Sequence, residues 1–187
     1  MTRRRAFLSL TALGSAALLA PRAHTQTART LADTLVGRPE FARFADMVSR
    51  AGALDDLRAA DTRTLFAPTD AAINALPASL VNDLTASADN ARSQVRPFVL
   101  NHLVQGNLSM ADLTKGARRL RTLNGVEIEL IGEGNTVALR SLNPQAPSFQ
   151  SGTSPTGIRI ETRPIEVVGA PIMASNGVIY PINGVLI

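Results

Sequence analysis

The sequence contains no cysteine and no tryptophan, and its histidines are His24 and His102. Without cysteine the chain cannot form a disulfide, a thiolate nucleophile, a cysteine-ligated zinc site or a lipid-anchored N-terminal cysteine. His24 lies in a region that we expect to be removed during export. A catalytic imidazole would therefore have to be His102, and a single histidine cannot form a histidine-based metal cluster.

The motifs of common enzyme classes are also absent. There is no G-x-S-x-G nucleophile elbow, no G-x-x-x-x-G-K phosphate loop and no H-E-x-x-H zinc motif. Asp55 and Asp56 are adjacent on an expected helix and point in different directions. Glu127 and Glu129 share a strand face, which is either simply solvated or able to hold a hard cation such as calcium. We therefore expect no enzyme activity and no cofactor.

Aromatic residues make up only 4% of the chain, whereas apolar residues make up 45% and charged residues 18%. This composition is typical of a globular protein, and a length of 187 residues suits one domain with an aliphatic core. We divide the chain into a leader over residues 1–28 and a single domain over residues 29–187. We expect no C-terminal anchor after that domain.

The leader has the three parts of an export signal. Arg3–Arg5 precede an apolar run, Phe7–Ala20, that is too short to span a membrane, and a polar region follows it. The segment Arg4–Leu8, RRAFL, resembles the twin-arginine pattern, and an ordinary secretory signal with a basic start is the alternative. We expect cleavage near residues 23–28 and a periplasmic, extracellular or cell-surface location.

Removal of the leader also removes the excess positive charge. The full chain carries a net charge of +4, but every acidic residue lies after residue 23 and the leader takes away arginines only, so the mature domain is neutral. A general nucleic-acid role therefore has no electrostatic support. One basic cluster is either the wet side of a strand or a docking site for an acidic polymer or lipid headgroup. Its members are Lys115, Arg118, Arg119 and Arg121.

Apolar periodicity predicts helices in the first half of the domain and strands in the second. The expected helices cover residues 31–37, 41–48, 54–59, 77–84 and 90–100, with Pro97 near a break between turns. The expected strands cover residues 103–104, 120–123, 126–130, 136–142, 158–168 and 172–187. Asn124-Gly125 predicts a two-residue turn between two of these strands. Residues 143–157 are rich in proline and are expected to form a surface loop, either a mobile insertion or a binding loop.

The segment Thr64–Ile73, TLFAPTDAAI, joins an expected buried strand to a helix. Pro68 has no N–H to give to a ladder and disfavours helix for the residue before it, so the strand is expected to end there. Thr69 or Asp70 can then cap the following helix. This segment closely resembles the signature of the fasciclin (FAS1) family, T-x-F-A-P-T-[DN]-x-A-[FI].

Two later segments resemble further elements of the same family, in the same order. Asn101–Gly106 resembles its Y-H-x-V-x-G element, with Asn101 in place of the tyrosine, and Ser175–Leu186 resembles its closing N-G-V-I-H-x-I-D-x-V-L element. The resemblance covers residues 31–187. The residues that match the motifs, with a structural role implied, are Thr64, Phe66, Ala67, Pro68, Thr69, Asp70, His102, Gly106, Asn176, Gly177, Val178 and Ile179.

The resemblance implies an α+β fold, namely a FAS1-type β-sandwich or wedge of about seven strands with several short helices packed at one end. It also implies that His102 bonds within the fold. The implied function is that of an exported, non-catalytic interaction module for adhesion or for association with the matrix and envelope. Its partner would be a protein or polysaccharide at the cell envelope, with no nucleic acid and no integral membrane anchor.

Some members of this family bind carotenoids, so the alternative function is a periplasmic carrier of an apolar small molecule. The ligand would lie between the helices and the sheet. The candidate lining residues, whose other role is ordinary core, are Ile73, Leu76, Val99, Val104, Ile172, Met173 and Tyr180.

The closing segment departs from the family pattern, with Tyr180 for histidine, Pro181 for valine and Asn183 for aspartate. Pro181 cannot donate to a ladder, so we expect it at an edge position or a bulge. Integrin-binding members use acidic-hydrophobic motifs near the stretch that corresponds to Gly169–Met173. That stretch contains no acid here, so integrin binding is not carried over.

Overall fold

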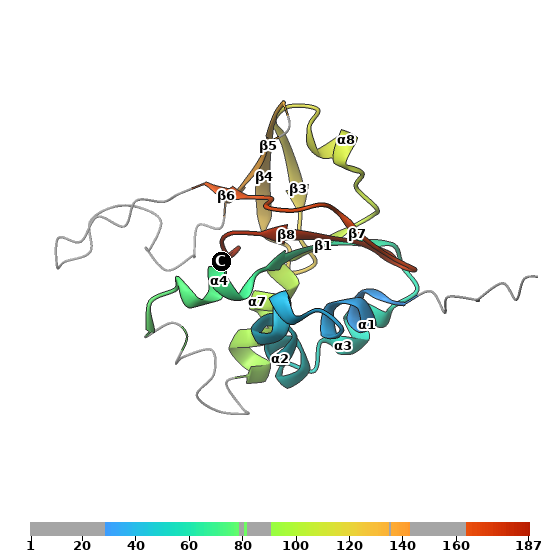
Figure 1. Ribbon diagram of the computed structural model, residues 1–187, viewed down its shortest axis with the longest axis vertical. Helices are drawn as coiled ribbons and strands as arrows, with labels where there is room; N and C mark the ends of the chain where they lie inside the picture. Colours follow the sequence, from blue (N-terminus) through green and yellow to red (C-terminus); the bar gives the residue numbers. More distant parts are fainter. Residues whose placement is uncertain (1–28, 79–80, 82–90, 135, 143–163) are drawn as a thin grey trace, which may run out of the picture.

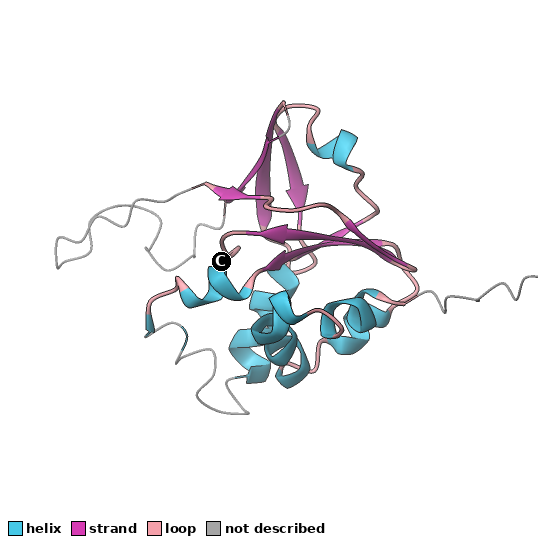
Figure 2. Ribbon diagram, viewed as in Figure 1, coloured by secondary structure: helices cyan, strands magenta, loops and turns pink. Residues whose placement is uncertain are grey.

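The computed structural model describes residues 29–78, 81, 91–134, 136–142 and 164–187. The predictions for the leader, for part of the helix at 77–84 and for the loop at 143–157 lie outside these residues. The described strands form two four-stranded sheets, and most of the helices lie on one side of the first sheet (Figures 1 and 2). This architecture confirms the predicted α+β fold, with eight strands in the described residues.

Three short helices precede the first strand. They are α1 (Leu31–Val36), α2 (Ala42–Arg50) and α3 (Leu54–Arg58), with a 3₁₀ turn, η1 (Pro39–Phe41), before α2. Thr30 caps α1, because its hydroxyl oxygen accepts the N–H of Asp33. All three helices were expected at these places, and the prediction of α2 came from the spacing of its apolar residues.

The other described helices lie between strands. They are α4 (Asp70–Asn74), a π-helical turn η2 (Ala91–Val95), α7 (Arg96–Asn101) and α8 (Met110–Leu113). Pro97 is the second residue of α7, directly after η2, as expected for a proline near a break. Proline is tolerated there because the first turn of a helix has no intrahelical partner for its N–H groups.

The first sheet has the order β2-β1-β8-β7. Its strands are β1 (Arg63–Pro68), β2 (Leu103–Gln105), β7 (Ile172–Ala174) and β8 (Gly177–Ile182). β1 and β8 are parallel, in register from Arg63 opposite Gly177 to Pro68 opposite Ile182, and the outer pairs are antiparallel. All of β8 is buried, which explains its continuous apolar sequence.

The second sheet is entirely antiparallel, in the order β3-β4-β5-β6. Its strands are β3 (Arg118–Arg121), β4 (Glu127–Glu133), β5 (Thr136–Ser141) and β6 (Ile165–Glu166). Ile128 and Leu130 are buried, whereas Glu127 is exposed. The predicted alternation of buried and wet residues in β4 is therefore confirmed.

The turn between β3 and β4 differs from the two-residue turn predicted from Asn124-Gly125. The N–H of Gly125 donates to the carbonyl of Thr122 at 2.9 Å, and the N–H of Thr122 donates to Val126 at 2.9 Å. Gly125 has a φ of 84°, whereas no described residue other than glycine has a positive φ. A type I′ turn would need positive φ at both central residues. Asn124 and Gly125 are therefore the last two residues of a three-residue loop between Thr122 and Val126. Within that loop only Gly125 takes the left-handed conformation.

Pro181 does not lie on an edge strand, because β8 is an inner strand of its sheet. Its carbonyl accepts the N–H of Val168 at 2.9 Å, so its backbone faces the β7 side of β8. On that side the ladder with β7 extends only as far as Ile179. Beyond the end of β7, the pairing in the described residues continues as the isolated bridge between Val167 and Ile182. There Pro181 accepts the bond from Val168 and cannot return one, so its missing N–H falls outside the ladder of β7 and β8.

The first sheet separates two apolar cores, and successive residues of β1 point into different ones. Leu65 lies in the helix-side core with Phe41, Phe44, Val99 and Ile179. Phe66 lies in the inter-sheet core and stacks on Tyr180, with a distance of 5.9 Å between ring centroids. Figure 1 shows the arrangement, with the helices and the second sheet on opposite sides of β1 and β8.

Replacing Gly177 with alanine should strongly destabilise the fold. A Cβ at this position would overlap the carbonyl oxygen of Arg63 and lie 2.9 Å from its carbonyl carbon, so β1 and β8 would have to separate. We expect a loss of about 3 kcal/mol or more, measured by urea unfolding. Gly52 is the matched control, because it has a φ of 65° with open space around it, and G52A should cost only about 1 kcal/mol. Equal losses in the two variants would contradict the predicted overlap.

Candidate functional site

His102 lies at the junction of α7 and β2, and its side chain is fully buried. Nδ1 is 2.7 Å from the carbonyl oxygen of Phe98, and Nε2 accepts the N–H of Leu186 at 3.0 Å. The rings of Phe98 and Phe44 flank the imidazole, with centroid distances of 4.7 Å and 5.4 Å. The side chain thus joins α7, α2 and the end of the sequence.

These partners determine the protonation of the ring. A carbonyl can only accept and a backbone N–H can only donate, so His102 is neutral, with its proton on Nδ1. Burial lowers the pKa of His102 from 6.5 to about 4, against an opposing contribution from its bond to Phe98. Both nitrogens are occupied by backbone groups, whereas a general base needs a nitrogen within reach of the substrate.

Asn176 is a second buried polar tie. Its Oδ1 accepts the N–H of Leu31 at 2.8 Å, and its Nδ2 donates to the carbonyls of Leu57 and Ala59, both at 2.8 Å. One amide therefore fixes the start of α1 and the end of α3 to the turn between β7 and β8. Asn101, which stands where the family pattern has tyrosine, accepts a bond from Asn124 Nδ2 at 2.9 Å.

The signature segment contributes further ties of the same kind. Thr64 donates from Oγ1 to Gly106 at 2.8 Å and accepts the N–H of Leu108 at 3.0 Å. Thr69 is the N-cap of α4, whereas Asp70 accepts the N–H of Arg43 near the start of α2 at 2.9 Å. Six further motif residues are all buried in β1 and β8, namely Phe66, Ala67, Pro68, Gly177, Val178 and Ile179.

The residues predicted to line an apolar ligand site do not face one common space. Ile73 and Val99 are buried in the helix-side core, and Leu76 and Ile172 pack against it. Val104 and Tyr180 lie in the inter-sheet core, where the Tyr180 hydroxyl donates to Leu108 at 2.8 Å. The side chain of the seventh residue, Met173, is on the surface.

The carboxylates and the basic cluster are arranged mainly in pairs. Asp56 pairs with Arg96 at 2.9 Å, away from its neighbour Asp55. Glu129 lies 4.0 Å from Arg140, so its charge has a partner that is not shared with Glu127. No group of three or more histidine, aspartate and glutamate side chains in the described ranges could hold a metal ion.

The basic cluster is likewise neutralised in part. Lys115 bonds Asp112 at 2.7 Å, and this contact, with that of Ser109, holds the pKa of Asp112 well below its usual range. Arg119 lies 4.0 Å from Glu127, and Arg121 donates to the carbonyl of Gly125 at 3.3 Å. These contacts agree with a solvated strand face.

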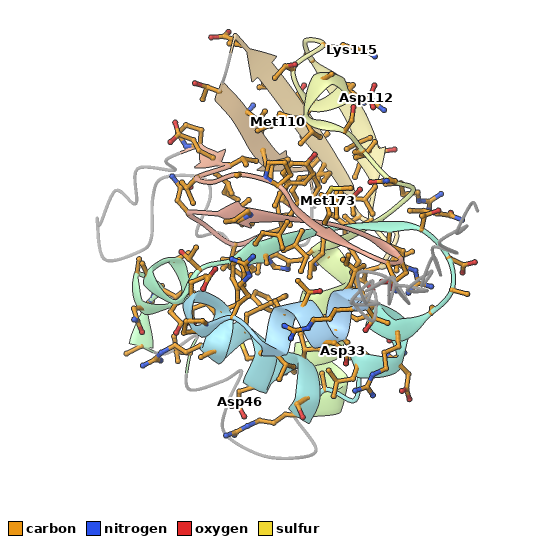
Figure 3. All side chains as sticks on the ribbon, turned by 45° about the vertical axis from the view of Figure 1, so that its right-hand side comes forward. Asp33, Asp46, Met110, Asp112, Lys115 and Met173 are labelled. Atoms are coloured by element: carbon orange, nitrogen blue, oxygen red, sulfur yellow. The ribbon has the colours of Figure 1, made fainter. Side chains whose placement is uncertain are left out.

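A surface groove beside β7 was not predicted from the sequence. It has a volume of about 470 Å³ and its lining residues are Arg38, Glu40, Gly169, Ala170, Pro171, Ile172, Met173 and Pro181. We call it the β7-edge groove. Met173 is 67% exposed, and Val168, just before the lining stretch, is 50% exposed. Figure 3 shows Met173 on β7, apart from Asp112 of α8 and its partner Lys115, which follows that helix. The apolar composition of Gly169–Met173 is the sequence signal that could have indicated this groove.

Known proteins with the same fold define the class of this domain. One solved structure, a FAS1 domain pair from the insect cell adhesion molecule Fasciclin I, superposes with a TM-score of 0.62 at 17% identity, over 85% of this chain and 51% of that one. At this identity the likeness shows the fold alone. The family model of the Fasciclin domain matches residues 39–187. The chain therefore belongs to the fasciclin family.

Two curated relatives support this assignment. The protein sll1483 of Synechocystis sp. is 25% identical over 166 residues, which cover 89% of this chain and 77% of that protein. The immunogenic protein MPB70 of Mycobacterium bovis is 35% identical over 74 residues, which cover 40% of this chain and 35% of MPB70. Fasciclin domains are generally non-catalytic modules that mediate adhesion and protein interactions.

The buried imidazole predicts a specific pH dependence of stability. The pKa of His102 is about 4 in the folded state against 6.5 when exposed, so the unfolded chain binds more protons between these values. The contribution of the neutral His102 ring to the stability of the fold is fully present above pH 6.5 and is lost as the pH falls toward 4. It corresponds to about 3 kcal/mol in the free energy of unfolding.

Urea unfolding at pH 7, 5.5 and 4 measures this slope. The His102→Gln variant should be less stable at pH 7 and should lack the part of the slope that belongs to the imidazole. A variant that retains the full slope would show that other groups cause it.

Proposed function

We propose that this protein is an exported, non-catalytic interaction module that uses the β7-edge groove to contact a protein at the cell envelope. The observation that carries the proposal is the exposure of Met173, at 67%, beside an open groove on an edge strand. Exposed apolar side chains around a concave surface are typical of interaction sites, and methionine adapts well to different partner surfaces.

The geometry of the edge fits an extended protein segment. β7 has a single ladder partner, β8, among the described strands, and we infer that its other edge can pair with an added strand. Arg38 and Glu40 bond each other at 3.2 Å at the groove and supply polar groups beside its apolar residues. This combination of an apolar centre and a polar border is common in protein interfaces.

A polysaccharide partner fits this face less well. Sugar rings often stack on exposed aromatic side chains, and the aromatic rings of the described residues are all at most 3% exposed. Those rings belong to Phe41, Phe44, Phe66, Phe98 and Tyr180. The carrier alternative has less support still, because its candidate lining residues are divided between two cores and the surface.

A charge at Met173 should weaken binding to the envelope. We expect M173E to reduce saturable binding of the purified protein to envelope preparations from its host by about 10-fold, because it places a charge in the centre of the contact. The matched control is L123E, since Leu123 is an exposed apolar residue in the distant β3–β4 loop. Equal binding of the two variants would contradict the assignment of this groove. Binding that survives protease treatment of the envelopes would point to a polysaccharide instead.

The export part of the proposal predicts the form of the protein in its host. Native mass spectrometry and an absorbance spectrum of protein purified from the envelope fraction should show a colourless polypeptide whose leader has been removed near residues 23–28. No helix in the described part of the chain is long and apolar enough to cross a membrane. An intact leader would contradict export, and a bound apolar mass or a visible absorption band would favour the carrier.

A further inference from the structure

The last five residues, 183–187, form a closing segment that lies over the ends of both cores. It follows β8, which ends at Ile182, and it belongs to no described helix or strand. Val185 is 7% exposed and packs in the helix-side core, whereas Leu186 is fully buried in the inter-sheet core. Displacement of this short segment would therefore uncover apolar surface in both cores at once.

Few hydrogen bonds hold the closing segment. The N–H of Leu186 donates to His102 Nε2 at 3.0 Å, and the carbonyl of Ile187 accepts from Ser141 Oγ at 2.6 Å. Asn183 exchanges bonds with Glu166, including one from its backbone N–H to the Glu166 carbonyl at 3.0 Å. The bond at the buried centre of the segment thus ends on a titratable ring, and residues 184–187 belong to none of the described ladders.

We propose that the bond between Leu186 and His102 is an acid-operated latch, and that protonation of Nε2 releases the closing segment and exposes the apolar surface beneath it. The physical reason is the direction of the bond. Protonated Nε2 is a donor and cannot accept, so it would face the Leu186 N–H with like polarity inside an apolar site. Nδ1 is already committed to Phe98, so the ring cannot turn to offer its other nitrogen without losing that bond.

The charged groups on the surrounding elements do not compensate for the positive charge that protonation would place on His102. On α7, Arg96 pairs with Asp56 at 2.9 Å, and on α2, Asp46 pairs with Arg50 at 2.8 Å on the outer side of the helix (Figure 3). These pairs are partly or largely exposed to solvent, and burial, not a neighbouring charge, dominates the pKa of His102.

Two other charged groups belong to neighbouring segments. Arg63 on β1 bonds the carbonyl of Asp56 and lies 3.5 Å from Asp61. The second titratable side chain that touches the closing segment is Glu166, whose Oε2 accepts from Asn183 Nδ2 at 3.3 Å. Glu166 therefore has to be separated from His102 by experiment.

Acid should favour the released state. If the ring regains its ordinary pKa of 6.5 when the segment is displaced, against about 4 when it is bound, the equilibrium for release rises as the pH falls between these values. The rise from pH 7 to pH 4 is then up to about 100-fold. The latch would make the interior surface accessible in acid while the first sheet remains folded.

Amide hydrogen exchange read by NMR on the full domain tests this proposal. Protection factors, which are corrected for the intrinsic exchange rate at each pH, are compared between pH 7 and pH 4 for Leu186 and for Ile179 in β8. We expect the protection of Leu186 to fall by up to 100-fold and to drop at least 10-fold below that of Ile179. The E166Q variant, which removes the other titratable contact, should show the same response.

Three outcomes would overturn the latch. Equal protection of Leu186 and Ile179 at every pH would mean that the segment leaves only when the whole domain unfolds. Unchanged protection of Leu186 would mean that the bond to His102 does not control it. Loss of the response in E166Q would assign the pH dependence to Glu166. Because E166Q changes an exposed contact, the test needs no substitution of the buried histidine.

Discussion

The structure depends on the parallel ladder between β1 and β8, which joins the first strand of the domain to the last over six registered pairs. Each face of this ladder lines one of the two cores. Leu65 and Ile179 lie in the helix-side core, whereas Phe66 and Tyr180 lie in the inter-sheet core. Parallel strands need a long connection, so this pairing brings together segments about a hundred residues apart. Such remote contacts cost chain entropy that burial and buried hydrogen bonds must offset.

Buried polar side chains hold this ladder, because the chain has no cysteine that could form a disulfide. Asn176 ties α1 and α3 to the β7–β8 turn across 145 and 119 positions, and His102 ties α7 to the closing segment across 84. Each bond satisfies a backbone group that would otherwise be buried without a partner, which is costly. The motifs that identify the family are thus explained by backbone ties and close packing, whereas the surface that we propose for a partner lies elsewhere, beside β7.

Much of the fold could be predicted because its signals are local. The apolar spacing of α2, the alternation of Ile128 and Leu130 with glutamates, and the strand ending near Pro68 follow from short-range chemistry. The placement of Pro181 on an inner strand could not be predicted, because it depends on how far β7 extends beside β8. The β7-edge groove could not be predicted either, because Arg38 and Met173, which both line it, are far apart in the sequence. The carrier hypothesis grouped seven apolar residues as the lining of one site, but their division between two cores and the surface is a tertiary property that the sequence does not show.

In this structure His102 is a neutral bridge between α7 and the closing segment, with its proton on Nδ1. The most direct test is an NMR experiment that correlates the imidazole nitrogens with the ring protons at pH 7, followed through a pH titration. We expect a protonated Nδ1, an unprotonated Nε2 and a ring that titrates well below pH 6.5, near 4. A proton on Nε2, or a ring that titrates near 6.5, would contradict it, because the bond from Leu186 could not then exist as described.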